Sequence, residues 1–174
     1  MQIHSTPHAG ALRLPIRGLA SAEIDPEAEP GQNNAGLRLV DPMPDDDFVF
    51  LQQTYRPSGG LANGDELATR LNVGGAGGFA RLARWIVGRQ LFSFAWHDRF
   101  WLPMFQFEVL ELVPRPGLHA VLAELVDVMD GRALADWFAQ PNDLLNGSSP
   151  AARLVSHGPA VQQAARLQRY VTRG

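Results

Sequence analysis

The sequence predicts a mainly α fold with a small β-hairpin wing, an α+β arrangement in which a winged helix-turn-helix is followed by a small helical bundle. The middle of the chain shows helical, turn, helical and hairpin patterns in succession. The last third shows apolar residues at helical spacing, with joints that contain Pro and Gly. The beginning is rich in Pro, Gly and acidic residues, a composition typical of loops. We therefore divide the chain into residues 1–54, 55–112 and 113–174.

Residues 1–54 are expected to form an acidic, Pro- and Gly-rich arm. They hold 3 Arg and 8 acidic residues, a net charge of −5. Residues 55–108 hold 6 Arg and 4 acidic residues (+2), and residues 109–174 hold 6 Arg and 6 acidic residues (0). The three segments together give the chain its net charge of −3. Within the arm, the run Phe48–Gln53 predicts a short strand. Asp45–Asp47 is interpreted as solvated charge rather than a magnesium site, because neither a second acidic cluster nor a phosphate-binding loop accompanies it.

Two short helices are predicted next. The run "NGDELATRL" that ends at Leu71 places acidic residues in a first helical turn, where they suit the helix dipole. In the run "GFARLARWIVG", Gly78 to Gly88, the apolar residues recur at the spacing of one helical face. That face, expected to point into the core, holds Phe79, Leu82, Ala83, Ile86 and Val87. The opposite face, expected to point to solvent, holds Arg81, Arg84 and Trp85.

The loop between these helices contains a glycine pattern that has two interpretations. Gly75, Gly77 and Ala80 have the G-x-G-x-x-A spacing of a turn that binds a dinucleotide pyrophosphate. That turn follows a strand, whereas here it joins two helices, and no second βαβ unit follows. We therefore expect a helix-to-helix turn over Gly74–Gly78, with at least one residue at positive φ and no nucleotide cofactor.

A hairpin is predicted after the second helix. Two β-rich runs, "LFSFAW" and "FWLPMFQF", flank the turn residues His97, Asp98 and Arg99. Pro103 is expected to end the second strand or to lie on a sheet edge, because proline has no N–H to donate to a neighbouring strand. The many aromatic residues of the hairpin are expected to pack in the core rather than to stack on nucleic-acid bases.

The last third predicts helices with short joints. The first helix carries one apolar stripe, made of Leu118, Val121, Leu122, Leu125, Val128 and Met129. A second helix must stop before Pro141. Ser149 and Pro150 are typical of the N-cap and first position of a third helix. Pro159 is likewise typical of the first position of a helix. The stripe expected to face the core of the terminal helix is Ala160, Ala164, Leu167 and Val171.

Composition argues against several classes of function. The chain has no cysteine, which excludes disulfides, thiol catalysis and thiolate zinc sites and fits a reducing compartment. Its five histidines are scattered without ligand spacing, and "GSSPA" lacks the G-x-S-x-G elbow of serine hydrolases. No segment is long and apolar enough to cross a bilayer. We expect a cytoplasmic protein that is not an enzyme and has no catalytic residues, metal site or cofactor.

The run "ALADWFAQPNDLLNGSSPAARLV" resembles the toxin-binding domain of the Xre/MbcA/ParS antitoxins. That family shows an aromatic pair at a helix end, then Pro-Asn, Leu, Gly, Pro and Leu at fixed spacing. The matching positions, which the resemblance implies are toxin-binding, are Trp137, Phe138, Pro141, Asn142, Leu145, Gly147, Pro150 and, one residue late, Leu154. The run after them looks like the terminal helix of the family.

The middle segment resembles compact winged helix-turn-helix modules of the MerR/excisionase type, so that the two resemblances together cover about residues 61–174. This resemblance implies DNA contacts from the second helix and from the wing. The candidate residues are Arg81, Arg84, Arg89 and Arg99. The helix departs from the type because it opens with glycines, which offer backbone N–H groups to a phosphate but no base readout.

The resemblance implies an antitoxin of a type II toxin–antitoxin pair that masks the active site of a RES-domain toxin. Such toxins consume NAD or use it to modify a target, and such antitoxins often repress their own operon as dimers. The expected partners are therefore the cognate toxin, operator DNA and a second copy, with no membrane. The alternative is a non-enzymatic interaction module whose degenerate helix-turn-helix no longer reads DNA.

Overall fold

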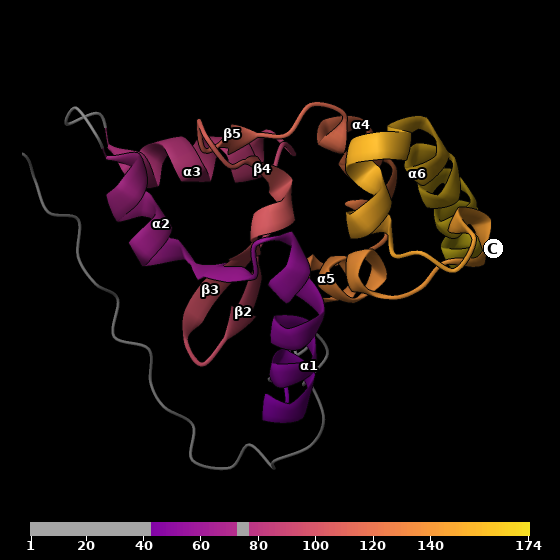
Figure 1. Cartoon of the computed structure of the whole chain (residues 1–174), viewed down its shortest axis with the longest axis horizontal. Coiled ribbons are helices and arrows are strands. Elements are labelled where there is room, and N and C mark those ends of the chain that lie inside the picture. The colour runs from indigo at the N-terminus through magenta and orange to yellow at the C-terminus, as the bar shows by residue number, and fades with distance from the viewer. Residues whose placement is uncertain (1–42, 73–76) are drawn as a thin grey trace, which may run out of the picture. The chain divides into compact units, whose positions relative to one another are not determined.

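Short helices accompany a small antiparallel sheet in the computed structural model, which describes residues 43–72 and 77–174 (Figure 1). The mainly α, α+β fold class predicted from the sequence is confirmed. The helices of this part are α1 (Asp45–Tyr55), α2 (Gly64–Leu71), α3 (Gly78–Val87), α4 (Leu118–Leu125), α5 (Gly131–Ala139) and α6 (Pro150–Arg173). The strands are β1 (Leu61–Asn63), β2 (Phe94–Trp96), β3 (Arg99–Pro103), β4 (Phe107–Glu108) and β5 (Val113–Pro114). Single 3-10 turns are η1 (Arg56–Ser58), η2 (Met104–Gln106) and η3 (Asp143–Leu145).

Helix α1 replaces the short strand predicted at Phe48–Gln53, and that prediction is wrong. The buried residues of α1 are Phe48, Leu51 and Tyr55, which share one helical face. The run suggested a strand because Val49 and Phe50 are also apolar and of types common in strands. Both side chains are exposed in the structure. The ring of Phe48 stacks on Trp96 at 3.7 Å, so α1 packs beside the β2–β3 hairpin (Figure 1). The arm expected over residues 1–54 therefore does not extend through α1.

The predicted hairpin is confirmed as β2 and β3, and β1 pairs with the other side of β3. His97 and Asp98, the two turn residues, both have positive φ (46° and 55°), as a tight turn that matches strand twist requires. Pro103 ends β3 and lies opposite Leu61, as expected for a residue without an N–H. Asp45, in the first turn of α1, pairs with His97 across 3.0 Å.

Helices α2 and α3 confirm that the glycine loop joins helix to helix. Oδ1 of Asn63 accepts a hydrogen bond from the N–H of Asp65 at 2.9 Å and caps α2. The loop ends at Gly77, whose φ of 60° confirms the expected positive φ, and Gly74–Ala76 lie outside the described residues. A Cβ on Gly78 would lie 1.9 Å from the carbonyl oxygen of Ala68, so the two helices meet closely at this glycine.

Helix α3 is rotated relative to the sequence prediction. Its buried residues are Gly78 and Leu82, and Trp85, expected to face solvent, is partly buried against Phe107 at 6.5 Å. Phe79 and Val87, expected in the core, are 60% and 83% exposed. The core assignment of Phe79 and Val87 and the solvent assignment of Trp85 are therefore wrong. The β4 strand covers the Trp85 side of the helix and leaves the other side exposed.

A second small hairpin, β4 and β5, was not predicted. Phe107 pairs with Pro114 and Glu108 with Val113. The turn η2 before it is fixed by Gln106, a fully buried residue. Its Oε1 accepts from the N–H of Phe92 at 2.8 Å, and its Nε2 donates to the carbonyl of the same residue at 3.0 Å.

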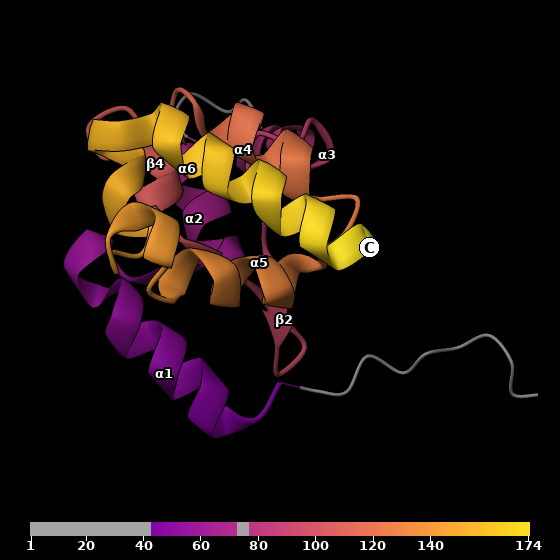
Figure 2. The ribbon, with the colours of Figure 1, turned by 90° about the vertical axis from the view of Figure 1, so that its right-hand side faces the viewer.

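Helices α4, α5 and α6 lie together, with α6 running past α4 and α5 (Figure 2). The α4 part of the predicted stripe is confirmed, since Leu118, Val121, Leu122 and Leu125 are buried. In α6, the backbone kinks at His157, just before Pro159. Of the stripe predicted for its second half, Ala164 is confirmed as buried, whereas Ala160, Leu167 and Val171 are exposed and their assignment is wrong. Val161 and Ala165 are buried beside Ala164 instead.

One hydrophobic core runs through the described part, from Met43 to Ala165. Phe138 of α5 stacks on Phe92 at 5.4 Å and lies 5.0 Å from Phe105. The hydroxyl of Tyr55 in α1 donates to the carbonyl of Ala135 in α5 at 2.6 Å. Contacts group Val40–Gly174 into one unit, so the expected parts 55–112 and 113–174 share their core.

Candidate functional site

The residues of the toxin-binding resemblance form the joint between α5 and α6. Asn142 organises this joint: its Oδ1 accepts from the N–H of Leu144 at 3.0 Å, and its carbonyl accepts from the N–H of Gly147 at 3.0 Å. Gly147 has a φ of 74°, which a residue with a side chain adopts only with strain. Pro150 occupies the first turn of α6, and Oγ of Ser149 caps the helix by accepting from Ala152. The residue types of the motif are thus those that this backbone path requires.

The aromatic pair at the end of α5 faces inward to different degrees. Phe138 is fully buried, and Trp137 is partly buried with its ring 4.9 Å from that of Phe138 in an edge-on arrangement. The indole N–H of Trp137 is buried and has no hydrogen-bond acceptor within the described structure.

Half of the eight candidate toxin-binding residues are inaccessible to a partner in this fold. Phe138, Leu145, Pro150 and Leu154 are buried in the core. Pro141 and Gly147 are exposed, and Trp137 and Asn142 are partly exposed. The buried four shape the joint, so direct contact with a partner has to come from exposed residues elsewhere on the surface.

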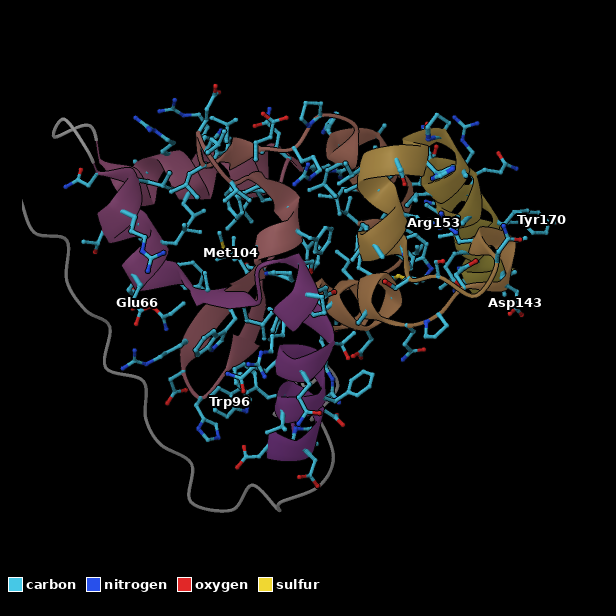
Figure 3. All side chains as sticks on the ribbon, viewed as in Figure 1. Glu66, Trp96, Met104, Asp143, Arg153 and Tyr170 are labelled. Carbon is cyan, nitrogen blue, oxygen red and sulfur yellow. The ribbon has the colours of Figure 1, made fainter. Side chains whose placement is uncertain are left out.

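The exposed apolar residues of α6 supply such a surface. Leu167, Tyr170 and Val171 lie at i, i+3 and i+4, which places them on one side of the helix. We call these three residues the C-terminal ridge. Tyr170 is 79% exposed and projects away from the helix in Figure 3. Sequence reasoning missed the ridge because it assigned Leu167 and Val171 to the core.

Two ion pairs hold the ridge-bearing part of α6 on α4. Nε of Arg166 lies 2.9 Å from Oε1 of Glu124, and Nη1 of Arg169 lies 2.8 Å from Oε2 of the same carboxylate. Glu124 is largely buried, with a side chain that is 12% exposed. The helix is therefore fixed at the position from which the ridge projects.

The four candidate DNA-contacting arginines differ in their surroundings. Arg84 and Arg99 are exposed, and Arg81 is partly buried. Arg89 pairs with Asp127 at 2.9 Å, so a phosphate would have to compete with a carboxylate for its guanidinium. Arg84 and Arg99 are thus the two candidates that are exposed and make no ion pair within the described residues.

An apolar groove lies between α3 and β3, on the side of α3 expected to face the core. Its volume is about 260 Å³, and it is lined by Phe79, Leu82, Ala83, Ile86, Val87, Ser93 and Phe100. The rings of Phe79 and Phe100 meet edge to face with centroids 6.0 Å apart. We call this the α3 groove. The exposed side of the helix expected to read DNA is therefore largely apolar.

In the described ranges, 43–72 and 77–174, no group of three or more His, Cys, Asp or Glu side chains is placed to hold a metal ion. Of the helices described, none has the length and apolar character needed to traverse a bilayer. Comparisons with protein-family models, with curated proteins and with solved structures gave no significant match. Function is therefore inferred from the residues and their geometry.

Proposed function

We propose that this protein is the antitoxin of a type II toxin–antitoxin pair and that it binds and occludes a RES-domain toxin. The observation that carries the proposal is the α5–α6 joint. Asn142, Gly147 and Pro150 each match the antitoxin motif, and each has the backbone role that its residue type favours. A joint of this form would fix the start of α6 relative to α5, and the ion pairs with Glu124 hold the part beyond the kink, which carries the ridge.

In this proposal the chain acts by covering the toxin. The C-terminal ridge supplies a central aromatic anchor, Tyr170, with aliphatic neighbours, which is the composition typical of interface residues that contribute most to binding. Arg166 and Arg169 lie beside the ridge and are held by Glu124, so they form a polar rim already in place. In this proposal the antitoxin acts in the cytoplasm.

A pull-down from co-expression tests this proposal. Full-length protein is co-expressed with the product of the gene beside its own, which this proposal expects to be a RES-domain toxin, and retention of that product is measured. Tyr170→Asp and Leu167→Asp should reduce retention at least 10-fold, since each places a charge in a desolvated contact. Val155→Asp is the matched control, because Val155 is also exposed on α6 but lies outside the ridge. Equal retention by all three variants would contradict the assignment of the ridge.

The α3 groove favours the second candidate, a helix-turn-helix that binds protein rather than DNA. Phe79 and Val87 occupy exposed positions at which a base-reading helix presents polar side chains. Operator binding would depend on Arg84 and Arg99, the exposed arginines of this surface. A gel-shift titration on the protein's own promoter at two salt concentrations separates the alternatives. A shift that Arg99→Ala weakens equally for all sequences supports phosphate contact, whereas no shift at low salt, with or without toxin, leaves the protein-binding module.

A further inference from the structure

The loop between β4 and β5 presents apolar side chains to solvent. Val109 is 73% exposed and Leu110 is 99% exposed. Acidic residues flank them, Glu108 on one side and Glu111 on the other. We call residues 108–111 the tip. Two adjacent, largely exposed aliphatic side chains at the end of a hairpin suggest a contact with another molecule.

The tip is held in a defined shape. The N–H of Leu112 donates to the carbonyl of Glu108 at 2.8 Å and closes the loop, with Leu112 at a φ of 50°. Such a positive φ is unfavourable for leucine, so the surrounding hydrogen bonds must enforce it. Arg115 clamps the base of the hairpin, since its Nε donates to the carbonyl of Phe105 at 2.9 Å and its Nη2 to that of Phe107 at 2.8 Å. A preorganised tip loses little conformational entropy on binding.

The α3 groove is complementary to the tip in both polarity and charge. Phe79, Val87 and Phe100 give it an apolar lining, and its volume of about 260 Å³ suits small aliphatic side chains. Helix α3 carries Arg81 and Arg84 and no acidic residue. Arg84 is exposed and lies on the helix surface next to Val87, three residues on. An apolar segment with flanking carboxylates therefore fits this groove.

We propose that the tip of one copy of this protein inserts into the α3 groove of a second copy. Val109 and Leu110 enter the groove, and the carboxylates of Glu108 and Glu111 face the arginines of α3. Pairing of two α3 helices with each other would instead bring the arginines of both copies together without an acidic partner. This contact does not depend on toxin binding.

The contact is small. Two aliphatic residues in a groove bury much less than the roughly 800 Å² per partner of a standard stable interface. We therefore expect weak self-association, with a dissociation constant between about 1 μM and 1 mM. A tip and a groove are different surfaces, so each copy can use its tip and its groove at the same time. A closed ring forms where the tip of the last copy in the series reaches the groove of the first copy.

Sedimentation analysis of the full-length protein over this concentration range tests the proposal. The weight-average mass of the wild type should rise with concentration. Leu110→Asp, which alters the tip, and Phe79→Asp, which alters the groove, should each remain monomeric. Val49→Asp, at an exposed aliphatic residue of α1, is the matched control and should associate like the wild type. If Phe79→Asp fails to fold by circular dichroism, Val87→Asp probes the same groove at a more exposed position.

Mixing the two monomeric variants is the decisive step. The Phe79→Asp chain keeps its tip and the Leu110→Asp chain keeps its groove, so an equimolar mixture should form heterodimers, although neither variant associates alone. Likewise, Glu111→Arg and Arg84→Glu should each weaken association, and mixing these two reversed-charge variants should restore part of it. A wild type that stays monomeric up to about 1 mM overturns the proposal. Association that Leu110→Asp leaves unchanged, or a mixture that stays monomeric, overturns it as well.

Discussion

Asp136, on α5, lies where its negative charge is unfavourable. Burial raises the pKa of its carboxyl above the ordinary value; the nearby Arg132 lowers that pKa, and Asp47 and Asp130 raise it, with burial the largest effect. The pKa of Tyr55 is also raised well above 10, first by burial and then by the charge of Asp136. The folded state therefore prefers a neutral group at position 136.

This preference predicts a pH-dependent effect of Asp136→Asn. The unfolded chain titrates Asp136 near pH 3.9, whereas the folded chain titrates it at a higher pH. The stability contributed by the protonated form is fully present below about pH 3.9 and is lost as the pH rises through the folded pKa. Asp136→Asn should therefore raise the melting temperature at pH 7, and this gain should shrink toward pH 3. A gain of the same size at both pH values would contradict the shifted pKa.

Single residues could be predicted from the sequence where their type dictates the local backbone. Gly147 and Pro150 are typical of a turn and a helix start, and the structure places them there. Gln106 could not be predicted in the same way, because two of its three hydrogen bonds join η2 to Phe92, which only the tertiary fold brings near. The positive φ of Leu112 also carries no signal in the sequence.

At the scale of elements, the existence of most helices was predictable, but the orientations of α3 and of the second half of α6 were not. Helix α3 has apolar residues around more than half of its circumference, so periodicity alone could not decide which side would be covered. The packing of Phe107 on Trp85 made that choice. The same ambiguity turned the exposed Leu167 of α6 into a predicted core residue, and with it hid the C-terminal ridge.

The crossing of α2 and α3 predicts a large effect of one methyl group. In Gly78→Ala, the new Cβ would lie 1.9 Å from the carbonyl oxygen of Ala68, a backbone atom that cannot rotate away. We expect a loss of roughly 1–3 kcal/mol in the free energy of unfolding, measured by urea denaturation.

Gly158→Ala is the matched control for that substitution. Gly158 lies beside the kink of α6, where the backbone leaves helical geometry at His157, and a Cβ there would meet nothing within 4 Å. Alanine at this position should be neutral or stabilise the protein by up to about 1 kcal/mol. Equal destabilisation by the two substitutions would contradict the close approach at Gly78 as the cause, because helix propensity alone favours alanine over glycine.

At the scale of the whole molecule, the shared core predicts which fragments fold. Phe138 packs on Phe92 and Phe105, which residues 118–174 lack, and Ala135 accepts its hydrogen bond from Tyr55. We expect residues 118–174 expressed alone to show no cooperative unfolding, and residues 40–174 to unfold in one transition. Cooperative unfolding of the shorter fragment would contradict a single core. Toxin binding should therefore be assayed with the full chain.

Inhibition of the toxin is the most direct test of the proposed function. The purified product of the neighbouring gene, which the proposal expects to be a RES-domain toxin, is mixed with NAD, and the NAD consumed is measured as full-length protein is added. Occlusion predicts that consumption falls to background once the added protein saturates the toxin. Tyr170→Asp should shift the half-inhibitory concentration upward at least 10-fold, and Val155→Asp should leave it unchanged. Undiminished NAD consumption in a saturating excess of folded wild-type protein would contradict the antitoxin function itself.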